Sequence, residues 1–150
     1  MDEEQYHAMY RSLNQQQCVF EKAISARRSN CNCATRFNLA DREGIACNSL
    51  ARYEHCLRLL QQLRKNASFA LHLTHVDGQL AHALEMKLQV GGLSGLEDVV
   101  LKGDPAAADM NDINGLLNAA KQQFGRIEDL PYTDIIKSIV HFKGRQRRRR

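Results

Sequence analysis

The sequence predicts an all-α protein, a small irregular helical domain of about five to six helices with a cysteine-ligated metal centre in its N-terminal half. In most segments apolar residues recur three and four positions apart, and Ser, Asp or Asn precedes several of these segments as an N-cap. Gly or Pro follows several of them. With 150 residues, 43% of them hydrophobic, the chain can bury a core.

The first helix is expected to begin after Asp2. Its apolar positions follow helical spacing at Tyr6, Met9, Tyr10 and Leu13. The run 14–17, rich in Gln, interrupts the pattern, which resumes at Phe20, Ala23 and Ile24. Cys18 is therefore expected at a junction between two helices.

The middle of the chain should contain a loop and the longest helix. Ser and Asn residues over 29–33 favour turns, so this segment is predicted to be a loop. A short helical turn is expected over 39–43, ended by Gly44, and a helix over about 49–73, capped by Asn48 and Ser49. The apolar stripe of this helix includes Cys56, which should face inward.

The C-terminal part is predicted to hold three more helices after a segment of mixed pattern over 80–90, which Gly91 and Gly92 should end. Ser94 and Glu97 match a capping box that opens a short helix through 102. Asp109 can cap the next helix, which carries an apolar face of Met110, Ile113, Leu116, Leu117, Ala120 and Phe124. The last helix should begin near Pro131 and bury Ile135, Ile136, Ile139 and Val140.

One domain is expected over 1–144, with its cysteine-rich part at 18–56 and a disordered basic tail at 145–150. No apolar run approaches the length of a membrane helix, and the first residues are acidic where a secretory signal is basic. We therefore expect a cytoplasmic protein without integral membrane association.

All five cysteines fall within 39 consecutive positions: Cys18, Cys31, Cys33, Cys47 and Cys56. An odd count in a chain without a visible signal peptide argues against a disulfide framework. Ligation of a metal by four of the five thiolates is the favoured interpretation, and buried inert thiols and a redox thiol switch are the alternatives.

The spacing C-x12-C-x-C-x13-C-x8-C favours an iron–sulfur cluster over zinc. A structural zinc site usually contains a C-x2-4-C pair, which is missing here. A 4Fe–4S cluster presents four separate iron corners that ligands from different segments can reach. Residues 18–65 also carry nine Lys or Arg against four Asp or Glu, which suits a negatively charged thiolate cluster. The expected cofactor is 4Fe–4S, with zinc as the alternative.

The second feature is the basic C-terminal end, which contains no acid over 141–150. We expect it to bind polyanions, nucleic acid or an acidic partner, through Lys143, Arg145, Arg147, Arg148, Arg149 and Arg150. A solubilising end or a membrane-surface contact is the alternative.

No catalytic motif is visible, since the chain lacks the phosphate-loop, dinucleotide-binding and G-x-S-x-G patterns. The neighbouring His72, His75 and His82 suggest a His/Glu metal site, but solvated histidines are the simpler interpretation. The sequence thus predicts a 4Fe–4S protein acting as a redox relay or sensor, with a protein redox partner or nucleic acid as its expected partner. The alternative is an interaction module, stabilised by zinc or a cluster, that docks to nucleic acid or a larger assembly through its tail.

Overall fold

The computed structural model describes residues 2–74, 78–107 and 112–143, and within these ranges the chain forms helices and one two-stranded sheet. The elements are α1 Glu3–Leu13, α2 Glu21–Ser25, β1 Ala34–Leu39, β2 Arg42–Cys47, α3 Leu50–Ala67, α4 His82–Gly103, α5 Ile113–Phe124 and α6 Tyr132–His141, with 3-10 turns η1 Pro105–Ala107 and η2 Ile127–Asp129. The prediction of a mostly helical fold is confirmed. The prediction that it is all-α is wrong, because β1 and β2 form an antiparallel hairpin.

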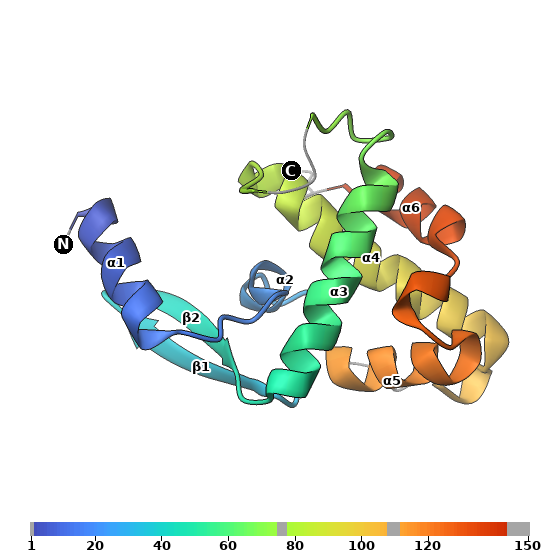
Figure 1. The fold of residues 1–150 in the computed structure, drawn as a ribbon, viewed down its shortest axis with the longest axis horizontal. Coiled ribbons are helices and arrows are strands. Elements are labelled where there is room, and N and C mark those ends of the chain that lie inside the picture. The colour runs from blue at the N-terminus through green and yellow to red at the C-terminus, as the bar shows by residue number, and fades with distance from the viewer. Residues whose placement is uncertain (1, 75–77, 108–111, 144–150) are drawn as a thin grey trace, which may run out of the picture.

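The long helix α3 stands between two regions of the molecule (Figure 1). On one side lie α5 and α6, and α4 passes behind α3 toward them; on the other side α1 and the hairpin extend away from the body, with α2 between them and α3 (Figure 1). Among the helices of the described ranges, none is both long and apolar enough to cross a bilayer. The basic tail predicted at 145–150 lies outside the described residues.

The helix α4 is continuous through the glycines that were expected to end it. A Cβ added at Gly91 would lie 2.8 Å from the Cα of Ile139, and one at Gly95 would lie 2.8 Å from the carbonyl oxygen of Ile135. These glycines therefore let the backbone of α6 approach α4 closely. The predicted break at Gly91–Gly92 and the helix start at Ser94 are both wrong, since this packing offsets the cost of glycine in a helix, about 1 kcal/mol per residue.

The core of the helical region is apolar and closely packed. Its fully buried side chains include Leu59, Leu63, Leu88, Leu96, Val100, Ile135 and Ile139. Ile135 and Ile139 were expected in the core and are buried there. Ile136 is only half-buried and Val140 is 42% exposed, because α6 turns a single face toward α4. The expectation that both are buried is wrong for Val140, whereas Ile136 is partly buried and packs against the core.

The hairpin replaces the helical turn that was expected over 39–43. Ala40 and Asp41 connect the strands, and both have positive φ, 51° and 67°. This is the backbone of a tight type I′ hairpin turn, which matches the twist of paired strands. Gly44 lies in β2 rather than at a helix end, where it pairs with Phe37 and leaves room for the rings of Phe37 and Tyr10.

The helix α1 packs on this hairpin with one face. Asp2 caps it by accepting a hydrogen bond from the Gln5 backbone N–H at 2.7 Å, as the sequence predicts. Tyr6 and Tyr10 are buried, whereas Met9 and Leu13 are 43% and 63% exposed. The helix predicted from this spacing is confirmed, and two of its four apolar positions stay exposed because α1 has the hairpin on one side only (Figure 1).

Helix caps fix the starts of α3 and α5. The Ser49 hydroxyl accepts a hydrogen bond from the Arg52 N–H at 3.4 Å, so the predicted cap of α3 is confirmed, although the helix ends at Ala67 rather than near 73. Asp112 caps α5 by accepting from the Gly115 N–H at 3.2 Å. Asp109, the cap that was expected, lies outside the described residues.

Candidate functional site

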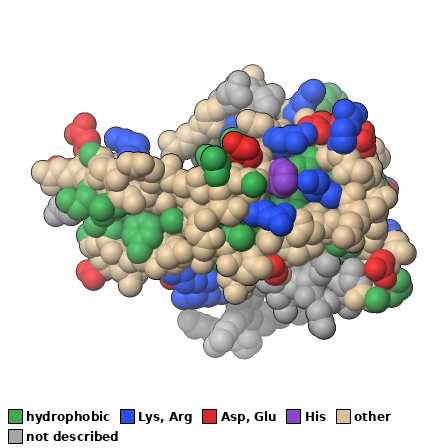
Figure 2. Space-filling view, turned by 60° about the horizontal axis from the view of Figure 1, so that its bottom comes forward, with side chains coloured by type: hydrophobic (Ala, Val, Ile, Leu, Met, Phe, Trp, Pro, Cys, Tyr) green, Lys and Arg blue, Asp and Glu red, His purple; other side chains and the backbone are tan. Residues whose placement is uncertain are grey.

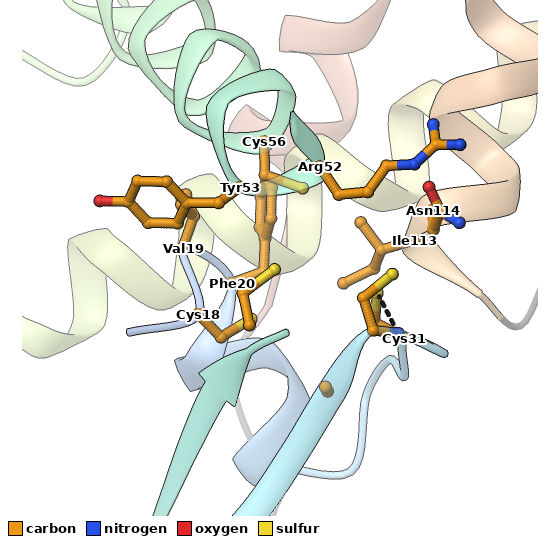
Figure 3. Close-up of a pocket in the computed structure, with 12 residues that line it drawn as sticks. Cys18, Val19, Phe20, Cys31, Arg52, Tyr53, Cys56, Ile113 and Asn114 are labelled. Carbon is orange, nitrogen blue, oxygen red and sulfur yellow. Dashed lines mark hydrogen bonds between the residues drawn. The ribbon is translucent and has the colours of Figure 1, made fainter. Parts of the chain in front are cut away.

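All five cysteines line one small cavity, which we call the cysteine cavity (Figure 3). Figure 3 shows Cys18, Cys31 and Cys56 approaching it from different elements of the chain. The structure thus brings together thiols that are up to 38 positions apart in the sequence. The other lining residues are Val19, Phe20, Ala34, Arg52, Tyr53, Ile113 and Asn114.

Backbone hydrogen bonds hold Cys18 beside Cys47. The Cys18 N–H donates to the Ile45 carbonyl at 2.9 Å, and the Cys47 N–H donates to the Gln16 carbonyl at 2.8 Å. The segment before α2 therefore runs along the free edge of β2. This arrangement confirms the expectation that Cys18 lies outside the helices.

The loop that carries Cys31 and Cys33 is attached at both ends. The Asn32 N–H donates to Asp112 Oδ1 at 2.8 Å, which ties the loop to the start of α5. At the other end, the Asn48 N–H donates to the Cys33 carbonyl at 2.9 Å, which ties it to the segment between β2 and α3. The prediction of a loop here is confirmed, and these contacts turn it toward the cavity.

Cys56 reaches the cavity from α3, where it is half-buried and packs against the core. Arg52 lies four positions earlier, so both side chains leave the same face of the helix. The Arg52 guanidinium donates to Asn118 Oδ1 on α5 at 2.6 Å. This contact keeps a positive charge at the rim of the cavity.

The sulfur atoms take part in hydrogen bonds with nearby backbone and amide groups. Cys31 Sγ accepts from the Cys33 N–H at 3.5 Å. The Cys33 thiol donates to Asn32 Oδ1 at 3.3 Å, and the Cys47 thiol donates to the Ser49 carbonyl at 3.3 Å. Cys31 sulfur therefore accepts a backbone hydrogen bond, as Cys18 does from the backbone of Phe20, and this interaction stabilises a thiolate.

Burial in the cavity favours the protonated form of three thiols, those of Cys18, Cys31 and Cys56. Burial raises the pKa of the Cys18 thiol to about 12, and nearby Cys31 and Cys47 add to the shift. Burial also raises the pKa of Cys56, with contributions from the other four cysteines. The pKa of Cys31 is raised by burial and is lowered in part by the N–H groups of Cys33 and Asn114. Ligation must therefore displace protons.

The positive charge counted over 18–65 is not concentrated at the thiols. Among the residues that line the cavity, Arg52 is the one with a formal positive charge. Arg36, Arg42 and Arg58 instead form ion pairs with the carboxylates of Glu43, Glu3 and Glu128. The electrostatic support for a cluster therefore depends on Arg52 rather than on the whole segment.

The unligated thiols are not arranged for a single metal ion. Within the described ranges, no three or more His, Cys, Asp or Glu side chains are grouped so that they could hold one. Four sulfurs on one zinc ion would have to lie about 3.8 Å apart, the edge of a tetrahedron with bonds of 2.3 Å. A four-iron cluster accepts more widely spaced ligands.

The histidines do not form a metal site among the described residues. His72 is exposed, and His82 Nδ1 lies 2.9 Å from the Lys22 amine. Glu85 accepts a hydrogen bond from Gln89 at 3.2 Å. His75 lies outside the described residues, so the structure bears on the interpretation as solvated histidines only for His72 and His82.

Two functional candidates were missed by the sequence reasoning. Arg52 could have been found, because a position four residues before Cys56 shares its helix face. Asn114, whose buried Oδ1 has no hydrogen-bond partner, had no such signal because it belongs to α5. Of the residues proposed for polyanion binding, the structure describes Lys143, which is exposed, and the arginines lie outside it.

Comparison with protein-family models finds no match, and comparisons with curated proteins and with solved structures find none either. The functional argument therefore depends on the chemistry of the cysteine cavity and its surroundings.

Proposed function

We propose that this protein binds a 4Fe–4S cluster in the cysteine cavity and acts as a redox relay or sensor. The observation that carries the proposal is the convergence of five thiols from two loops, a strand end and a helix on one cavity. Unrelated core thiols would have no reason to meet at one point. Cysteine thiolates are the usual ligands of such clusters.

The walls of the cavity suit a cluster in two respects. Val19, Phe20 and Ile113 are apolar, and hydrophobic surroundings limit solvent access to a redox centre. Backbone N–H groups directed at Cys31 sulfur are of the kind that tune cluster potentials. The free space is about 20 Å³, so binding also requires the thiol side chains to rotate outward.

The cluster, when bound, supplies one-electron chemistry, and the chain supplies the ligands and their surroundings. Because burial raises the pKa of Cys18, Cys31 and Cys56, thiol protons leave as the thiolates become ligands. Arg52 offsets part of the negative charge that four thiolates bring. Loading with iron and sulfide should therefore become more favourable as pH rises.

Analysis of iron, acid-labile sulfide and zinc in full-length protein purified anaerobically tests the proposal. We expect a brown protein with iron and sulfide in equal amounts and little zinc. Cys56→Ser should lose both, whereas Leu50→Ser, at an exposed position on the same helix, should retain them. Protein that carries zinc, or no metal at all, would overturn the proposal.

A second candidate is an interaction module in which zinc or a cluster only stabilises the fold. It is favoured by the six Lys and Arg residues, without any acid, over 141–150. If this end binds phosphates, deleting 145–150 should weaken binding to duplex DNA. The slope of the log binding constant against the log salt concentration should also become less steep, by about 0.9 for each phosphate contact that is lost. Unchanged binding and slope would remove this candidate.

A further inference from the structure

We propose that a basic surface beside the cysteine cavity docks an acidic redox protein, an inference that rests on the proposed function and names its partner. We call this surface the basic face; it consists of Arg52, His55, Arg58 and Lys121. Figure 2 shows Lys and Arg side chains gathered around a histidine on the side of the molecule that comes forward in that view.

Two helices build the basic face. Arg52, His55 and Arg58 follow one another at intervals of three on α3, so they share one side of the helix. On α5, Asn118 and Lys121 are also three positions apart. The helices meet through two contacts: Arg52 Nη1 lies 2.6 Å from Asn118 Oδ1, and Lys121 Nζ lies 3.5 Å from His55 Nε2.

The charge of the basic face is only partly compensated. Arg58 forms an ion pair with Glu128, whereas Arg52 and Lys121 have no carboxylate within 4.0 Å among the described residues. Arg52, Arg58 and Lys121 therefore hold like charges on adjoining sides of the two helices. An acidic surface placed here would relieve this repulsion.

The location favours a redox partner over nucleic acid. Arg52 belongs both to the basic face and to the wall of the cavity, next to Cys56. A partner docked here would be close enough for one electron to pass between its own redox group and the cluster. Glu54, near His55, and Glu128 border the face, so a continuous phosphate backbone would meet carboxylates there. Small charged interfaces are typical of electron-transfer complexes.

Binding of a fluorescent oligoglutamate peptide to the full-length, anaerobically purified protein tests the basic face. Lys121→Glu should weaken binding about tenfold, and Lys121→Gln, which keeps the packed stem, about threefold. Lys87→Glu is the matched control, because Lys87 is also half-buried on a helix but lies on a groove with Ala26 and Phe142. It should change the affinity less than twofold.

Equal losses in the Lys121→Glu and Lys87→Glu proteins would overturn the inference, because binding would then follow net charge alone. Tighter binding of duplex DNA with the same dependence on Lys121 would overturn the choice of partner. The iron content of each preparation separates the two proposals. Lys121-dependent binding in iron-free protein would refute the cluster and support an acidic partner, whereas iron-loaded protein without that dependence would refute the basic face.

Discussion

The helical region and the cysteine region of this protein are held together in different ways. In the helical region, α4 packs on α6 through glycines, and side chains such as Leu96 and Ile135 are fully buried. In the cysteine region, all five thiols are half-buried, and hydrogen bonds join residues 16–18 to β2 and the Cys31–Cys33 loop to the start of α5. On the proposed function, a bound cluster would therefore matter more to the stability of the second region than to that of the first.

The magnitudes support this contrast. Full burial of a Leu or Ile side chain stabilises a fold by about 1.5–3 kcal/mol, and α4 and α6 contribute several such residues. A typical intramolecular hydrogen bond contributes only about 0.5–1.5 kcal/mol net. The anchors between residues 16–18, β2 and the start of α5 are of this weaker kind. Ligation of the thiols would supply what the cysteine region lacks.

The largest effect is expected where the helices approach most closely. Gly95→Leu should destabilise the protein by about 3 kcal/mol or more, because its side chain would meet the backbone of α6 at Ile135. Denaturant unfolding measures the change. Gly103→Ala, at the end of the same helix, is the control, since the added Cβ would meet only the flexible end of Gln123. Similar losses in both variants would contradict the close-packing account.

Removal of the proposed cluster should have the next largest effect and should act differently on the two regions. After anaerobic chelation of iron, amide exchange over 31–47 should accelerate at least tenfold, about 1.4 kcal/mol of lost protection. Amides of α4 between Leu88 and Val100 should change less than threefold, because their protection comes from apolar packing. Hydrogen exchange followed by mass spectrometry measures both. Equal acceleration everywhere would show a single cooperative unit.

Single substitutions of Cys31 and Cys33 test the cysteine region further, since five thiolates exceed the four corners of a cluster and one should be dispensable. Cys31→Ser should reduce the iron content at least fivefold, because Cys31 packs against the core and its sulfur already accepts backbone hydrogen bonds. Cys33→Ser should retain most of the iron, because its thiol is bonded to Asn32 instead. Loss of iron in both variants would require a different ligand set.

The smallest effect concerns the contact of the hairpin with α2. Glu21 accepts hydrogen bonds from the Tyr10 hydroxyl and from the Ile45 N–H, and burial raises the pKa of its carboxyl. A carboxyl with a raised pKa in the folded state stabilises the fold below pH 4.5, and this contribution is lost as pH rises through the folded pKa. Glu21→Gln should remove that pH dependence and change stability at pH 7 by about 1 kcal/mol or less.

Thermal melts of both proteins between pH 4 and pH 7 measure this dependence. The stability of the Glu21→Gln protein relative to the parent should increase toward pH 7. If the Glu21→Gln protein instead gained stability relative to the parent toward low pH, the claim that burial raises the pKa of Glu21 would be contradicted.

Local signals in the sequence predicted α1, α5, α6 and the start of α3. Caps such as Asp2 and Ser49 act within one turn, and the apolar spacing of a helix needs no knowledge of its neighbour. The continuity of α4 could not be predicted in this way. Gly91 and Gly95 are acceptable there only because α6, more than 35 residues later, packs on them.

The hairpin was missed because its turn carries no strong signal. Ala40 and Asp41 adopt the positive φ values that Asn-Gly pairs usually provide in such turns. Pairing of β2 with residues 16–18 is also non-local. For the site, clustering in the sequence identified the five cysteines, but Arg52 and Asn114 join it only through the meeting of α3 with α5.

Native mass spectrometry of the full-length protein, purified and sprayed without oxygen, tests the central claim most directly. The proposal predicts one dominant species, with the mass of the chain plus four irons and four sulfides, and the same preparation of Cys56→Ser should show the chain alone. A dominant species with the mass of the bare chain, or of the chain plus a single zinc ion, would contradict it.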